Sequence, residues 1–134
     1  MPGSEELLEL DLPARPTYVA VARSVVTAAA AGLDGLDADR LDDLRLAVSE
    51  ACTSVVAAGD VERVTIRCRH DAVALEVSIE DTGAQTAAER FDGENALALQ
   101  VLTALVDELL LDGDGDGNAM RLRLLFDVPA DDPT

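Results

Sequence analysis

The stretch LRLAVSEACTSVVAA, from Leu44 to Ala58, has the spacing of an amphipathic helix. At about 100° per residue, one face of that helix is apolar. The apolar positions are Leu41, Leu44, Val48, Ala51, Cys52 and Val55. Glu50 and Ser54 lie roughly 40° apart beside this face, where residues four apart can act together. An acid in that position is either a solvated surface residue or a side chain held for a task.

A second helix is predicted on the N-terminal side of this stretch. Pro16 suits the first position of a helix, and apolar residues then recur at helical spacing as far as Leu33. We expect Gly32 to close that helix in a left-handed conformation. Asp37 is expected to cap the helix that contains Glu50, and Gly59 is expected to end it.

Strands are predicted where apolar and polar residues alternate. The predicted strands cover residues 8–12, 64–69, 73–79 and 120–126, with a short one beginning at 109–111. His70 and Asp71 fall in a turn, and a third helix is predicted over 97–109. Neighbouring strands of this kind favour an antiparallel sheet with one wet face. The fold class is therefore α+β, a two-layer sandwich with a mostly antiparallel sheet covered by three helices.

Length and charge exclude several classes of protein. The 134 residues fit one domain, which we place at 5–128, with flexible tails at 1–4 and 129–134. The net charge is −17 and every basic residue is an arginine, so nucleic acid and anionic membranes are not expected partners. The sequence contains neither a long apolar span nor a secretory leader, and we expect a cytoplasmic protein.

Several familiar sites can be dismissed. Cys52 and Cys68 fall on apolar faces and are predicted to be buried, reduced and inert. The acidic run DGDGDGN, residues 112–118, begins like a calcium loop, but Arg123 takes the place of the required glutamate, and a tight turn is the better interpretation. His70 is the only histidine and falls in a hairpin turn, which argues against a Ser-His-Asp triad. The absence of lysine excludes a GxxxxGK[ST] phosphate loop.

One group of residues remains as a candidate site. Glu50 and Ser54 share a helix, Asp81 and Gly83 follow a strand, and a loop leads into the N-terminus of the third helix. A helix N-terminus can hold phosphate. An aspartate at a strand end can accept a hydrogen bond from the amine of a base, and a helix-borne acid can act as a general base. Each feature alone is equally compatible with a solvated acid or a turn.

Four segments resemble, in order, the anti-sigma factors of the RsbW and SpoIIAB type. They are LDLPARPTYVAVAR, DDLRLAVSEACTSVV, IEDTGA and ALALQVLTALVDEL, and the resemblance covers roughly residues 8 to 128. These proteins are serine-protein kinases with the GHKL (Bergerat, histidine kinase/Hsp90-like) ATPase fold. The resemblance implies an alternative sigma factor as partner and a homodimer. It also implies an anti-anti-sigma STAS protein that is phosphorylated on serine with ATP and magnesium.

The resemblance also implies roles for individual residues. Glu50 matches the general base, Asp81 matches the acid that hydrogen-bonds the adenine amine, and Gly83 matches the glycine beside it. Ser54 stands where the family has its magnesium-binding asparagine, so no metal-binding residue is assigned.

The phosphate side of the implied pocket departs from the family in two further ways. Ala96 and Ala98 replace the glycines of a GxGL motif, and alanine favours a continuous helix by about 1 kcal/mol per site. The loop between Gly83 and Ala96 is also short for an ATP lid. We therefore expect an anti-sigma factor with a degenerate nucleotide pocket and lost or weakened kinase activity. An active kinase of the anti-anti-sigma protein, and a module of the same fold that binds only a STAS protein, are the alternatives.

Overall fold

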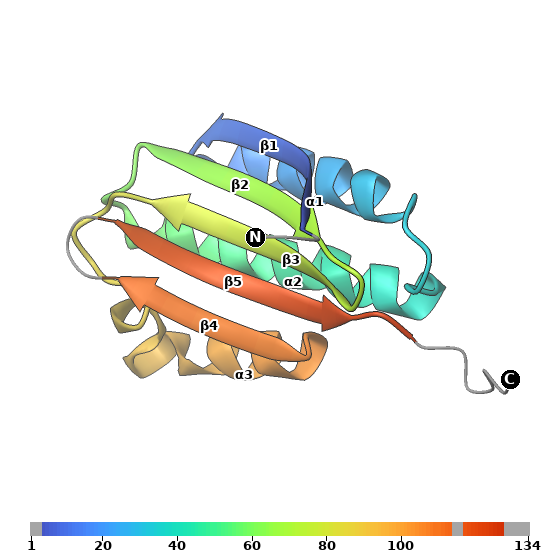
Figure 1. Cartoon of the computed structure of the whole chain (residues 1–134). Helices are drawn as coiled ribbons and strands as arrows, with labels where there is room; N and C mark the ends of the chain where they lie inside the picture. Colours follow the sequence, from blue (N-terminus) through green and yellow to red (C-terminus); the bar gives the residue numbers. More distant parts are fainter. Residues whose placement is uncertain (1–3, 114–116, 128–134) are drawn as a thin grey trace, which may run out of the picture.

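A computed structural model of the chain consists of a five-stranded sheet with three helices on one face (Figure 1). It describes residues 4–113 and 117–127. The sheet order is β1-β2-β3-β5-β4, and every pairing is antiparallel. The strands are β1 Glu5–Pro13, β2 Arg63–His70, β3 Ala74–Asp81, β4 Glu108–Gly113 and β5 Asn118–Leu125; the helices are α1 Pro16–Ala30, α2 Ala38–Ala58 and α3 Ala96–Leu105. The predicted two-layer α+β sandwich is confirmed.

The core lies between the sheet and the helices. The inward residues of β3, Leu75, Val77 and Ile79, are almost completely buried. The apolar face of α2 is buried opposite the sheet, with Leu44, Ala47, Val48, Ala51, Cys52 and Val55 in one cluster. Glu50 and Ser54 are half-buried, as expected for residues at the border of that face. Burial raises the pKa of the Cys52 and Cys68 thiols to about 12, so both are neutral.

Most helix ends follow their predicted signals. Asp37 caps α2, since its carboxylate accepts a hydrogen bond from the Arg40 backbone N–H at 2.9 Å. Gly59 ends α2 with a φ of 78°. The prediction for Gly32 is wrong, because α1 ends at Ala30 and the left-handed position is Gly35, with a φ of 101°. A side chain at Gly35 would clash, because its Cβ would lie 2.7 Å from the Cβ of Phe126.

The third helix is shorter than predicted. It ends at Leu105, and Val106 is already extended, with a φ of −122°. The apolar residues 109–111 are compatible with either a helix or a strand. They form a strand because they pair with β5, with Leu109 opposite Leu122. His70 is also misplaced by the prediction, since it is the last residue of β2 and the turn begins at Asp71.

Three further predictions fall wholly or partly outside the described residues. These are the two tails, of which only Ser4 is described, and the middle of the 112–118 turn. Within the described residues, no helix is long and apolar enough to cross a membrane.

Candidate functional site

Asp81, the last residue of β3, forms a buried ion pair with Arg90. The Nη1 and Nη2 atoms of Arg90 each lie 2.6 Å from a different carboxylate oxygen of Asp81. Both side chains are only 1% exposed. The backbone N–H of Gly83 and the side-chain amide of Asn118 also donate to Asp81, at 2.8 and 3.1 Å. The carboxylate therefore accepts four hydrogen bonds, all from within the chain.

Arg90 reaches Asp81 because the loop before α3 forms a short helical turn. Thr86 and Glu89 make a capping box. The Thr86 hydroxyl accepts from the Glu89 N–H at 3.2 Å, and the Glu89 carboxylate accepts from the Thr86 N–H at 2.8 Å. The turn η1, Glu89–Phe91, then packs between α2 and α3. Ala87 and Phe91 join the core, and the loop is thus folded onto the body of the domain.

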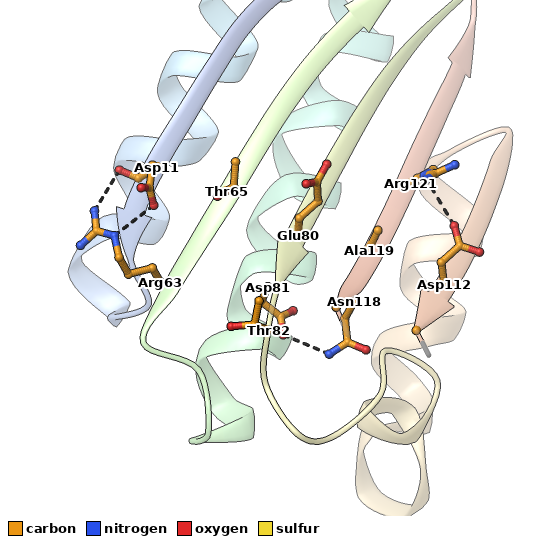
Figure 2. Close-up of a pocket in the computed structure, with 12 residues that line it drawn as sticks. Asp11, Arg63, Thr65, Glu80, Asp81, Thr82, Asp112, Asn118, Ala119 and Arg121 are labelled. Carbon is orange, nitrogen blue, oxygen red and sulfur yellow. Dashed lines mark hydrogen bonds and ion pairs between the residues drawn. The ribbon is translucent and has the colours of Figure 1, made fainter. Parts of the chain in front are cut away.

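The first half of this loop is tied to the ends of β3 and β5. The amide of Asn118 donates to Asp81 and to the backbone oxygens of Gly83 and Gln85, each at 3.1 Å. Asp60, just after α2, accepts from the Gln85 N–H at 2.9 Å. Figure 2 shows Asp81 and Asn118 pointing toward each other at neighbouring strand ends.

The electrostatics of the pair favour an ionised Asp81. Burial alone would raise the pKa of its carboxyl. The hydrogen bonds from Arg90, Gly83 and Asn118 outweigh burial and lower that pKa below its ordinary value. The Nε of Arg90 is buried and has no hydrogen-bond partner among the residues that the structure describes. The pair is thus strongly held at one end of the guanidinium and unsatisfied at the other.

Glu50 and Ser54 are connected through the helix backbone. The Ser54 hydroxyl donates to the backbone oxygen of Glu50 at 3.0 Å, which is the usual bond of a serine inside a helix. In the part of the chain that the structure describes, no hydrogen bond or ion pair holds the Glu50 carboxylate. Among the same residues, no cluster of three histidine, cysteine or acidic side chains could hold a metal ion.

Ala96 and Ala98 form the first turn of α3. Ala96 has helical backbone angles, a φ of −61° and a ψ of −31°, and its side chain is exposed. Ala98 is half-buried and packs against the core cluster. The left-handed glycine of this region is Gly93, with a φ of 62°, in the turn η2, Gly93–Asn95, that leads into the helix.

An open depression lies on the other face of the sheet, beside the same strand ends (Figure 2). Its rim carries ion pairs between Arg63 and Asp11 at 3.1 Å and between Arg121 and Asp112 at 3.5 Å. Of the candidate site residues, only Asp81 contributes to its lining. The depression is therefore separate from Glu50 and Ser54.

Sequence reasoning grouped Asp81 with Gly83 correctly but missed Arg90, Asn118 and Asp60. A signal for Arg90 was present, because Thr86-Ala87-Ala88-Glu89 is a capping-box pattern and predicts a helical turn. Such a turn places Ala87 and Arg90, three apart, on one side. The sequence pattern places Asn118 in a predicted turn and Asp60 just after a predicted helix, and nothing in it separates them from solvated residues; in the structure Asn118 is the first residue of β5.

A family of proteins described as the histidine kinase-like ATPase domain matches residues 12–124, from the end of β1 into β5. The chain belongs to this family.

Within the family, the chain is similar to RsbW proteins. The serine-protein kinase RsbW of Bacillus pumilus (strain SAFR-032) is 30% identical over 125 residues, which cover 78% of this chain and 76% of that protein. RsbW of Bacillus subtilis (strain 168) is 30% identical over 128 residues, which cover 81% and 79%. This chain therefore belongs to the RsbW branch of the family.

A solved structure has the same fold. It contains the RsbU and RsbW domains of Rv1364c from Mycobacterium tuberculosis and matches 91% of this chain with a TM-score of 0.67 and 19% identity. The chain spans 33% of that longer protein.

Proposed function

We propose that this chain is a cytoplasmic anti-sigma regulatory factor whose kinase activity is lost or weakened. It binds an alternative sigma factor, keeps it from RNA polymerase, and is released by an anti-anti-sigma STAS protein. The observation that carries this proposal is the similarity to RsbW over more than three-quarters of the chain. A homodimer is part of the proposal, through the same relationship.

The weakened phosphoryl transfer is inferred from the α2 side of the site. The hydroxyl of Ser54 is bonded to the Glu50 backbone at 3.0 Å and stands where the family has a magnesium-binding amide. Magnesium requires near-octahedral oxygen ligands, and the shorter serine side chain cannot reach the place of an amide carbonyl without a shift or a bridging water. The residues present do not fit the magnesium ion that the family uses.

The start of α3 supports the same proposal. Ala96 is helical and Ala98 packs on the core, so this segment is a regular helix where the family has a glycine-rich motif. Glycine permits a close approach of the backbone to phosphate, and a methyl group at each position obstructs it. Regulation would then depend on competition between protein partners.

An active kinase is the second candidate function. It is favoured by Glu50, whose carboxylate is half-buried on α2 and can accept a proton. A module that binds only a STAS protein is the third, and it differs from the first in having no sigma-factor partner.

Co-purification tests the proposal directly. The chain is mixed with each sigma factor and each STAS protein encoded in its own genome, with and without ATP and magnesium. We expect one sigma factor to co-elute without nucleotide, and the cognate STAS protein to displace it. Binding of no sigma factor would contradict the proposal. Nucleotide-dependent transfer of phosphate to a STAS serine would support the kinase instead, with Glu50→Gln as the inactive control.

A further inference from the structure

We propose that Arg90 is a built-in latch that occupies the adenine-recognition position at Asp81 and keeps residues 84–95 folded over the site. The assignment of Asp81 as that position rests on the family relationship used in the proposed function. The latch itself follows from the contacts of Arg90, none of which sequence reasoning included.

Most hydrogen-bond acceptor positions of the Asp81 carboxylate are already filled. A carboxylate offers about four lone-pair positions. Three donors already converge on Oδ1, from Gly83, Asn118 and Arg90, and the second Arg90 nitrogen takes Oδ2. Oδ2 keeps one acceptor position, but the Asp81 side chain is only 1% exposed, so an adenine amine could reach this carboxylate only by displacing a group that covers it. Arg90 is the donor that belongs to a short loop segment, while Asn118 is part of β5.

The space beside Asp81 is taken up by Arg90 because Gly83 has no side chain. At Gly83, a Cβ would lie 3.0 Å from Nη2 of Arg90 and 2.8 Å from a methyl group of Val61. In this structure, the missing side chain of Gly83 thus leaves room for a guanidinium group. The planar guanidinium of Arg90 donates two parallel hydrogen bonds to the Asp81 carboxylate, so a group of the chain itself takes the place that a ligand would take.

The turn η1 holds Arg90 in the closed position. Arg90 enters from the turn η1, which packs against α2 and α3; Phe91 of this turn and the nearby Ala87 are buried in the core. The loop thus fills the helix-side approach to Asp81 with one charged and two apolar side chains. Entry of an adenine ring beside Asp81 would require Arg90 to move.

Two features of Arg90 and Gly93 favour opening of the latch. The Nε of Arg90 is buried, and no described residue accepts a hydrogen bond from it. A buried ion pair also loses much of its attraction to desolvation. After the turn, Gly93 has a φ of 62° and no described atom lies within 4 Å of its Cβ position, so packing there does not oppose a change in the backbone of this permissive residue. These features describe a two-state loop whose closed state a ligand for Asp81 would oppose.

Adenosine binding tests the latch without reference to phosphate, magnesium or a protein partner. Wild type, Arg90→Ala and Arg90→Gln are titrated with adenosine by NMR, with far-UV circular dichroism to confirm folding. Arg45→Ala is the matched control, because Arg45 is an exposed arginine on α2 and its loss changes the charge equally. We expect both Arg90 variants to bind adenosine at least tenfold more tightly than wild type, and Arg45→Ala to match wild type.

Two results would overturn the proposal. One is a folded Arg90 variant that binds adenosine no better than wild type, which would make Arg90 a purely structural partner. The other is equally tight binding by wild type. A failed search for a sigma factor would leave this comparison intact, so the latch and the proposed function can fail separately.

Hydrogen exchange on the wild-type protein gives a test that needs no variant. A latch predicts that the amides of residues 84–95 exchange together, at least tenfold faster than those of β3. Exchange of this segment only through global unfolding would show that the loop does not open by itself, and it would contradict the latch.

Discussion

The two acids of the candidate site have opposite environments. Asp81 is buried and accepts four hydrogen bonds from its own chain, while Glu50 is half-buried and makes no ion pair with any described residue. The first carboxylate is committed to the fold, and the second is free to meet a partner. Asp81, which matches the family motif, is therefore the acid whose hydrogen-bonding positions are filled by the chain itself.

The largest effect is expected from breaking the Asp81–Arg90 pair. Arg90→Ala leaves a buried carboxylate without its cation, which costs about 3–5 kcal/mol. Urea unfolding should register this loss, whereas Glu50→Gln and Arg45→Ala should each stay within about 0.5 kcal/mol of wild type. Equal effects of Arg90→Ala and Glu50→Gln would remove the difference between the two acids.

Acid should weaken the same pair. The pKa of Asp81 is lowered in the folded state, against an ordinary value of about 3.9. Its contribution to stability is therefore fully present above that value and is lost as the pH falls through the lower folded pKa. The stability difference between wild type and Asp81→Asn should be constant from about pH 7 to 5 and shrink below about pH 4. A difference that is independent of pH would mean that the ionised form of Asp81 is not what the site stabilises.

A smaller effect is expected at Asn118. Asn118→Ala removes three donor contacts and leaves Gly83, Gln85 and Asp81 with fewer partners, which costs about 1–3 kcal/mol. Arg90 should still hold Asp81, so adenosine binding should stay as weak as in wild type. Tight adenosine binding by this variant would show that Asn118, and not Arg90, closes the position.

The smallest effect is expected at the capping box. Thr86→Ala removes the cap of the short turn and should cost about 1 kcal/mol. The change should appear as faster hydrogen exchange over residues 84–95 and little change in the sheet. Thr82→Ala, an exposed threonine in the same connection, is the control. Similar exchange in the two variants would mean that the capping box does not hold the loop.

Much of the fold followed from local patterns, because most strands alternate cleanly and the caps at Asp37 and Gly59 use standard signals. The errors arose where two local solutions compete. Leu109 to Leu111 could continue the helix or begin a strand, and pairing of β4 with β5 decides for the strand. The left-handed position is Gly35 and not Gly32, and its close approach to Phe126, where a Cβ would lie at 2.7 Å, is a tertiary contact that local pattern cannot indicate.

The site was harder to predict than the fold. Arginine is seldom fully buried unless it is paired, and the partner of Arg90 lies nine residues earlier at the end of another element. Sequence spacing could indicate the turn but not the direction in which its side chain points. Ser54 illustrates the reverse case, since its replacement of asparagine was visible in the sequence and its bond to Glu50 only in the structure.

The central claim is that Arg90 of the resting protein holds the acid that would otherwise receive a nucleotide. NMR of the arginine side chains measures this directly, because a hydrogen-bonded, buried guanidinium gives slowly exchanging Nη signals. Such signals are predicted for Arg90 in nucleotide-free wild type, and their loss is predicted in Asp81→Asn. Rapidly exchanging Arg90 signals in nucleotide-free wild type would contradict the claim.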